Sequence, residues 1–115
     1  MTKLRKCIIL LPTTYNDGAV IPFTVLQGIL KEVDRKFDGH SIDGHVDGTY
    51  KMDDGSFVSD RSIKVWIAVD PMKVDDLKIL AARIAGTLKQ ESIYFEVTDA
   101  EVEFIRALPQ TGEIL

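Results

Sequence analysis

The chain has 115 residues, of which 45% are hydrophobic, and a formal net charge of −4. This is the size and composition of one globular domain, which can bury roughly two thirds of its unfolded surface without a disulfide or a metal to hold it together. Its lysines and arginines are scattered and its sequence pI is about 5.1, so it lacks the basic stripe of a nucleic-acid-binding protein. We therefore expect no nucleic-acid partner.

The single cysteine, Cys7, has no internal partner for a disulfide, which fits a reducing compartment. It opens a short apolar run and has no histidine beside it, so we interpret it as a buried hydrophobe rather than a reactive thiol. The run over 7–11 is only long enough for one strand, and we recognise neither a signal peptide nor a membrane-spanning stretch. We expect a cytoplasmic protein without a membrane partner.

The first half of the chain predicts a strand, a helix and a second strand. Residues 6–11 form a continuous apolar run, as in a central strand covered on both faces. Over 22–37 the apolar residues recur at steps of three and four, which predicts an amphipathic helix. Over 41–52 the period changes to two, with one wet face that includes His45 and one covered face that includes Ile42, Val46, Tyr50 and Met52. Glycines 44 and 48 in this strand indicate a bend or a bulge.

The second half predicts a hairpin, a helix and a last strand. A turn follows Asp53, and 62–69 alternates as a strand with Trp66 on its outer side. An apolar stripe over 74–89 predicts the second helix, with acidic residues in its first turn. The last core strand is expected over 92–97, and a short fifth strand is possible over 101–105. Residues 108–115 are expected to form a loose tail.

This order of elements is typical of the ferredoxin-like βαββαβ sandwich, an α+β fold. Right-handed crossovers give an antiparallel sheet in the order 4-1-3-2 with both helices on one face. We expect one such domain over 1–107, followed by the tail.

That topology brings three polar loops to one end of the sheet. One loop follows the first strand, another joins the second and third strands, and the last follows the second helix. Their carboxylates, hydroxyls and arginine could bind a small polar ligand or a divalent cation, and the candidate residues are Thr13, Tyr15, Asn16, Asp17, Asp60, Arg61, Gln90 and Glu91. The alternative, which loop composition favours, is that these residues only form turns and caps.

A run of histidines and aspartates lies on the second strand. Asp43, His45 and Asp47 alternate on one side of it, about 7 Å apart, which is loose for one ion. A polar solvent face on an edge strand explains them better. We expect no metal and no cofactor.

The sheet face turned away from the helices carries apolar side chains from three neighbouring strands. A Trp at the middle of an open face usually means a partner, a cavity or an added element. We therefore predict an interface or a cavity formed by Ile8, Leu10, Trp66 and Tyr94. A homodimer that joins two such faces would cover these residues, as would the C-terminal segment of the same chain.

Four short segments in order carry a resemblance. They are Asn16-Asp17-Gly18, Phe37-Asp38-Gly39, Gly48-x-Tyr50 and Lys89-Gln90-Glu91-Ser92. Across residues 8–97 the chain resembles small bacterial proteins of unknown function with a ferredoxin-like pattern. The resemblance implies the fold and carries over no residue role.

Together these features favour a binding or interaction module, a homodimer through its open sheet face, with a small polar ligand or a protein partner. One alternative is a small dimeric enzyme with an apolar cavity on that face, where His45 or Glu96 acts as a base. Another alternative is a metal-dependent, nuclease-like dimer that uses Asp17. The absence of a basic surface in the sequence argues against it.

Overall fold

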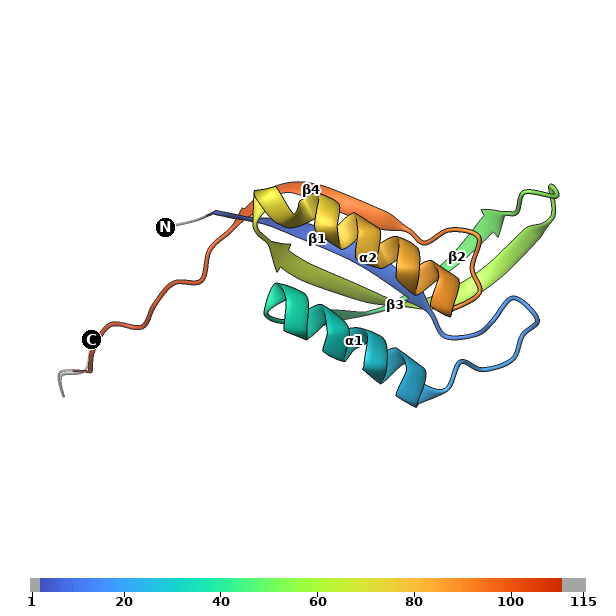
Figure 1. The fold of residues 1–115 in the computed structure, drawn as a ribbon, viewed down its shortest axis with the longest axis horizontal. Helices are drawn as coiled ribbons and strands as arrows, with labels where there is room; N and C mark the ends of the chain where they lie inside the picture. Colours follow the sequence, from blue (N-terminus) through green and yellow to red (C-terminus); the bar gives the residue numbers. More distant parts are fainter. Residues whose placement is uncertain (1–2, 111–115) are drawn as a thin grey trace.

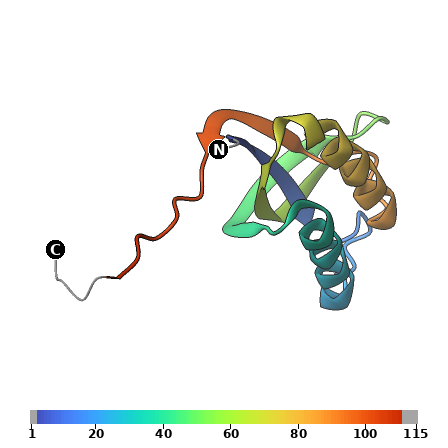
Figure 2. The same ribbon diagram turned by 60° about the vertical axis from the view of Figure 1, so that its left-hand side comes forward.

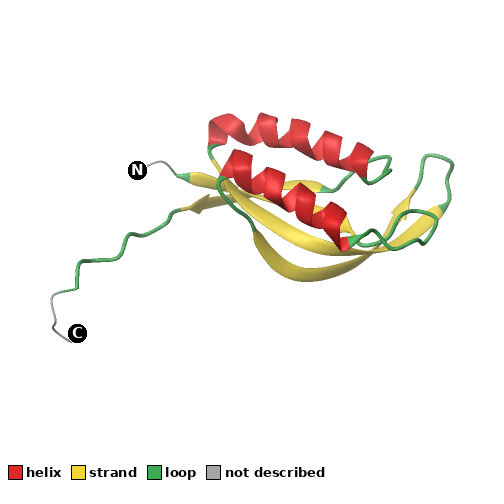
Figure 3. Ribbon diagram, turned by 60° about the horizontal axis from the view of Figure 1, so that its bottom comes forward, coloured by secondary structure: helices red, strands yellow, loops and turns green. Residues whose placement is uncertain are grey.

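The computed structural model describes residues 3–110 and shows one four-stranded sheet with two helices on one side (Figures 1 and 3). The elements follow in the order β1 (Leu4–Pro12), α1 (Phe23–Phe37), β2 (Ser41–Lys51), β3 (Phe57–Val69), a 3-10 turn η1 (Pro71–Lys73), α2 (Val74–Thr87) and β4 (Phe95–Val102). The sheet order is β2-β3-β1-β4 and every pair of neighbours is antiparallel. The predicted ferredoxin-like α+β arrangement is confirmed.

The core lies between the sheet and the helices. Alternate residues of β1 face the helices, so Cys7, Ile9 and Leu11 are buried, while Ile8 and Leu10 face the other way. The predicted stripes of the two helices cover this layer, with the buried side chains of Leu26, Ile29, Val33, Phe37, Leu77, Leu80, Ala81 and Ile84. We call the opposite side of the sheet the open face.

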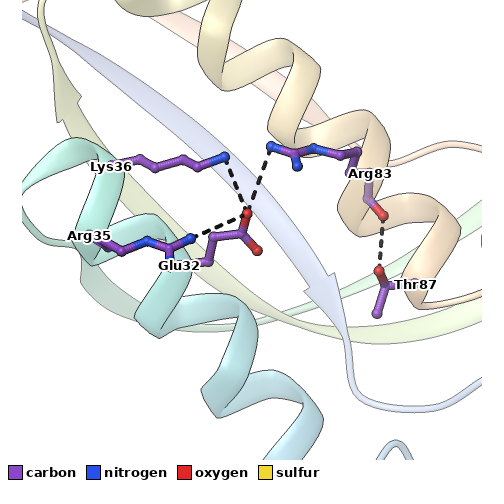
Figure 4. Close-up of polar contacts among 5 residues, drawn as sticks. All are labelled: Glu32, Arg35, Lys36, Arg83 and Thr87. Carbon is purple, nitrogen blue, oxygen red and sulfur yellow. Dashed lines mark hydrogen bonds and ion pairs between the residues drawn. The ribbon is translucent and has the colours of Figure 1, made fainter.

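One carboxylate joins the outer surfaces of the two helices (Figure 4). Glu32 on α1 lies 3.3 Å from the ammonium of Lys36 and 3.7 Å from the guanidinium of Arg83 on α2. All three side chains are partly exposed to solvent, so this cluster contributes little stability.

A bulge in β2 changes which residues face the helices. Ile42 pairs with Val65, but the register then shifts, and His45 pairs with Ile63. Gly44 in the shifted segment has φ +79°, a conformation that glycine adopts without strain. The expected bulge is therefore present. Because of it, Val46 shares the open face with Ser62, so the expectation that Ile42 and Val46 share one face is wrong.

The strand after the hairpin is longer than the sequence pattern suggests. β3 begins at Phe57, five residues before the expected start, because the hairpin closes tightly. The amide of Met52 donates to the Ser56 carbonyl, and the Asp54 carboxylate accepts from both the amide and the hydroxyl of Ser56. These two hydrogen bonds hold the pKa of Asp54 below its ordinary value.

The last strand includes only the first two residues of the expected fifth strand. β4 runs from Phe95 to Val102, with an irregularity in its pairing opposite Arg5 and Lys6. Residues 103–105 belong to no strand, so the separate fifth strand over 101–105 is wrong. Of the predicted loose tail, residues 108–110 lie in no helix or strand, and 111–115 lie outside the described residues.

Across residues 3–110, neither helix combines the length and the apolarity that a bilayer crossing needs.

The thiol of Cys7 is expected to be inert in the folded protein. Cys7 is fully buried in the core, and burial raises its pKa although Arg5 and Lys78 act in the opposite direction. A thiol reagent at neutral pH should therefore modify the native protein slowly and the denatured protein fast. Stopped-flow absorbance with a chromogenic disulfide reagent measures both rates. Labelling of the folded protein at the rate of a free thiol in solution would contradict the buried position.

Candidate functional site

Three loops meet at one end of the sheet, which we call the hairpin end. The Lys89 ammonium lies 5.5 Å from the centre of the Tyr15 ring, so the loop after β1 contacts the turn after α2. The amide of Asp53 in the hairpin donates to Glu91 at 3.2 Å. The hydroxyl of Thr13 donates to the Arg61 carbonyl at 2.8 Å. The structure thus brings these segments together.

The sheet nevertheless separates the polar residues of this end into two groups. Asp60 pairs with Gly48 and lies on the open face, whereas Arg61 pairs with Asp47 on the helix side. The Arg61 guanidinium lies 3.9 Å from the Asp47 carboxylate there. Asp60 and Arg61 are neighbours in sequence, but they cannot contact one ligand from the same side.

Several of the predicted ligand residues have local roles. The Asp17 carboxylate accepts from the Ala19 amide inside the loop, and Asn16 is exposed beside it. The amide of Gln90 donates to the Ala85 carbonyl and its side chain donates to the Leu88 carbonyl, so Gln90 closes the end of α2. These contacts account for Asp17 and Gln90 without a ligand.

A cavity of about 190 Å³ opens on the open face at the hairpin end. It is lined by Leu10, Pro12, Tyr50, Lys51, Met52, Asp60, Ser62, Gln90, Glu91, Ser92, Ile93 and Tyr94. We call it the open-face cavity. It contains Asp60, Gln90 and Glu91 of the residues predicted as ligands, and Leu10 and Tyr94 of those predicted for an interface or cavity.

A phenol and a carboxylate form a pair beside the cavity. The hydroxyl of Tyr94 donates to Glu96 Oε1 at 2.7 Å, and the hydroxyl of Thr98 donates to the other oxygen at 3.2 Å. The bond from Tyr94 holds the pKa of Glu96 below its ordinary value, and the same bond raises the pKa of Tyr94. Glu96 is therefore an anion at neutral pH and Tyr94 is a neutral phenol. Because 46% of Tyr94 is exposed, its ring is accessible from solvent.

Tyr50 was missed as a site residue, and its position depends on a glycine. A Cβ atom at position 48 would lie 2.6 Å from the Tyr50 hydroxyl oxygen, closer than real Cβ contacts allow. Gly48 therefore lets the Tyr50 ring lie flat along β2 at the edge of the cavity. The pattern Gly48-x-Tyr50 is the sequence signal that could have found it, once the bulge at Gly44 is known.

Replacing Gly48 with alanine is expected to move the Tyr50 ring without unfolding the protein. The added methyl group meets the far end of a side chain that can rotate, so the melting temperature should change by only about 2–4 °C. Nuclear Overhauser contacts between the Tyr50 ring and the position 48 α-protons should disappear. Thr49→Ala, on the other side of the same strand, is the matched control. Unchanged ring contacts in the Gly48 variant would contradict this account of the glycine.

Burial raises the pKa of Asp60 above its ordinary value. Asp60 therefore makes its full contribution to stability below its ordinary pKa of 3.8. This contribution is lost as the pH rises through the raised pKa of the folded state. Asp60→Asn should consequently gain stability relative to the wild type between acidic and neutral pH, by less than about 0.5 kcal/mol for a partly exposed position.

Urea unfolding at pH 3.5 and at pH 7 measures this difference. Asp53→Asn, which removes a carboxylate from an exposed position of the same hairpin end, is the control. An Asp60→Asn variant that loses stability at neutral pH would show that the carboxylate is instead held by a favourable partner.

The centre of the open face is better covered than the sequence suggests. Ile8 and Leu10 are only 5% and 9% exposed in the single chain. Trp66 is half-buried, with the Lys6 ammonium 5.0 Å from the centre of its ring. Lys64 beside it pairs with Asp43 at 3.5 Å. The exposed apolar surface is therefore concentrated at the hairpin end, around Tyr94, rather than at Trp66.

The histidine positions do not support catalysis on the open face. His45 pairs with Ile63, whose side chain packs against the core, so His45 lies on the helix side of the sheet. The expectation that His45 acts as a base in an open-face cavity is wrong, and the bulge is the reason. Within residues 3–110 no three His, Cys, Asp or Glu side chains are arranged to hold a metal ion, and Asp17 is engaged in its own loop.

No model of a protein family and no curated protein matches the chain. Solved structures do match its fold. One is a phage SAM lyase in complex with S-methyl-5'-thioadenosine, with a TM-score of 0.66, 14% identity, and coverage of 86% of this chain and 87% of that one. A phage SAM lyase in its apo state matches with a TM-score of 0.64 and 15% identity, and the match covers 92% of this chain and 94% of that one. The divalent cation tolerance protein CutA1 from Thermus thermophilus matches with a TM-score of 0.52 and 12% identity, and the match covers 94% of this chain and 88% of that one. At these identities the likeness concerns the fold.

Proposed function

We propose that this protein is a self-associating binding module whose open-face cavity takes a small organic cation of the adenosyl sulfonium class. One observation carries the proposal: Tyr50, Tyr94 and Asp60 line this cavity, and Glu96 beside it accepts a hydrogen bond from Tyr94, on the sheet face that no helix covers. The proposal refines the ligand predicted from the sequence and moves it from the loops to the open face.

The charges around the cavity favour a cation. Asp60 and Glu91 line it and Glu96 stands beside Tyr94, whereas Lys51 is the one basic side chain in the described lining. The faces of tyrosine rings attract weakly hydrated cations, such as sulfonium and quaternary ammonium groups. A carboxylate near the same group adds Coulombic attraction, which is stronger at the edge of a protein than in bulk water.

The size of the cavity favours self-association. Sites for small molecules usually enclose about 300–1,000 Å³, and the open-face cavity holds about 190 Å³. One chain therefore supplies part of the enclosure, and a second copy applied to the open face would supply the rest. Tyr94 at the rim, with its exposed ring, is the natural contact for that copy.

The matching structures support the nature of the ligand. A phage SAM lyase has the same arrangement of strands and helices, and one of the matching structures is its complex with S-methyl-5'-thioadenosine. S-Adenosylmethionine is a sulfonium cation joined to an adenosine, and it has both the charge and the flat ring that two carboxylates and two tyrosines would hold.

Isothermal titration with three related compounds tests the proposal. S-Adenosylmethionine should bind more tightly than S-adenosylhomocysteine by about tenfold or more, because the latter has the same shape without the sulfonium charge, and one such interaction contributes about 1.4 kcal/mol. S-Methyl-5'-thioadenosine tests the nucleoside part alone. Asp60→Asn should reduce the preference for the cation, and Asp53→Asn should preserve it. Absence of saturable binding for all three compounds would contradict the proposal.

A second candidate function is cleavage of the same ligand, and the Tyr94–Glu96 pair favours it. The anionic Glu96 would accept a proton from a carbon adjacent to the one that bears sulfur. A carbon–carbon double bond would form there, and the electrons of the broken carbon–sulfur bond would remain on sulfur as a neutral thioether. Mass spectrometry of S-adenosylmethionine incubated with the protein would detect S-methyl-5'-thioadenosine. Wild-type protein that binds but releases none is a binding module, and release that survives in Glu96→Gln excludes Glu96 as the base.

A further inference from the structure

The chain beyond β4 forms an extended arm, residues 103–110, that leaves the domain (Figures 1 and 2). The molecule is consequently 62 Å long but only 28 and 23 Å across. The arm exposes three large apolar side chains, with 68% of Phe104, 80% of Ile105 and 82% of Leu108 accessible to solvent.

This composition is unusual for a segment without structure. Chains that remain disordered are poor in apolar side chains, because they have nothing to bury. The arm instead concentrates three of them within five residues, 104–108. An extended apolar segment of this kind gains most when it lies in a groove of another chain and becomes ordered there.

A groove of suitable size lies beside the root of the arm. It has a volume of about 610 Å³ and runs from the end of α1, past the start of β2, to the lower part of the open face. It is lined by Leu4, Lys36, Phe37, Asp38, Gly39, His40, Ser41, Trp66, Ala68, Val69, Asp70, Lys73 and Phe104. We call it the root groove.

The arm of the same chain does not fill this groove. Phe104 lines it, but Ile105 and Leu108 are not among its lining residues, and the arm continues away from the domain (Figure 2). Every copy of the chain therefore presents both an apolar segment and a groove that is open next to it. Such a complementary pair on one molecule is satisfied by a symmetric exchange between two copies.

We infer that the arm of one copy lies in the root groove of a second copy, and that the second arm lies reciprocally in the first groove. Ile105 and Leu108 would pack against Phe37 and Trp66 of the other copy. The groove includes Trp66 and Ala68 of the open face, so the exchanged arm would reach the same side of the sheet as the open-face cavity. The inference rests on the proposed self-association and does not depend on the ligand.

Disulfide trapping between two single-substitution variants tests the exchange. One variant is Leu108→Cys, and the other is Lys73→Cys, at an exposed position that lines the groove. A short affinity tag on one variant distinguishes their masses. After mixing and mild oxidation, we expect a covalent dimer that contains one copy of each and joins positions 108 and 73. Lys31→Cys, exposed on α1 and outside the groove lining, is the matched control and should give little product. The native Cys7 is buried and can remain.

A double variant with both cysteines in one chain distinguishes exchange from folding back. A disulfide within one chain would overturn the inference, because the arm would then occupy its own groove. The mass of the unoxidised protein, measured by light scattering, separates the remaining outcomes. Absence of the mixed disulfide in a protein that is still dimeric would overturn the arm exchange alone. A monomer at high micromolar concentration would overturn both the exchange and the proposed self-association.

Discussion

Replacing Tyr94 with alanine is expected to weaken the binding of S-adenosylmethionine by about 30-fold or more, which corresponds to about 2 kcal/mol. The substitution removes one aromatic wall of the open-face cavity. It also removes the hydrogen bond that positions the Glu96 carboxylate, since the phenol donates to it at 2.7 Å. Titration calorimetry measures the dissociation constant. The melting temperature of the monomer should change little, because 46% of Tyr94 is exposed in the single chain.

Tyr94→Phe separates the two roles of this side chain. Phenylalanine keeps the ring and loses only the bond to Glu96, so its dissociation constant should lie between those of the wild type and of Tyr94→Ala. Tyr15→Ala, at the hairpin end but outside the described lining of the cavity, is the matched control. Equal affinity in the wild type and Tyr94→Ala would show that the ligand binds elsewhere.

Shortening Ile9 to alanine is expected to destabilise the protein by about 2–5 kcal/mol, because the side chain is fully buried and the surrounding core can close the cavity only in part. For a domain of this size the melting temperature should fall by roughly 8–20 °C. Chemical and thermal unfolding followed by circular dichroism measure both quantities.

Ile79→Ala makes the same chemical change on the exposed side of α2. It should change the free energy of unfolding by less than about 0.5 kcal/mol. Similar losses in the two variants would contradict the placement of the core between the sheet and the helices.

The fold could be predicted from the sequence because the spacing of the hydrophobic residues indicates which side of each helix and strand is buried. The continuous apolar run that contains Ile9 predicted a central strand, and the three- and four-residue steps predicted both helices. Topological rules then fixed the strand order. The extent of β3 could not be predicted, because its first residues alternate weakly and depend on pairing with β2 for their structure.

The site was less predictable because a single bulge changes the parity of a strand. The shift at Gly44 places Tyr50 on the open face and moves His45 to the helix side. A glycine in a strand indicates that a bulge is possible but not between which residues the register shifts. Loop proximity was predicted more successfully, since Glu91 does contact the hairpin at Asp53. The assignment of Asp60 and Arg61 to opposite sides follows only from the observed register.

The open face shows why exposure is hard to predict from alternation alone. Alternation places Trp66 on the outer side, which is correct, but it does not show that the Lys6 side chain lies over the ring. Long basic side chains cover apolar surface while keeping the charge in water. On the open face the exposed aromatic side chains are therefore Tyr50 and Tyr94 rather than Trp66, and the arm adds exposed apolar side chains that the strand pattern did not indicate.

An NMR titration of isotope-labelled protein with S-adenosylmethionine tests the ligand site most directly. If the open-face cavity is that site, the amide signals of Tyr50, Ser62 and Tyr94 should shift in a saturable way, because these residues line the cavity on three neighbouring segments. Signals of Lys31 and Ile79, on the exposed sides of the two helices, should stay in place. Saturable shifts confined to the helices or to the loop around Asp17, or no shifts at millimolar ligand, would contradict the assignment of the open-face cavity as the binding site.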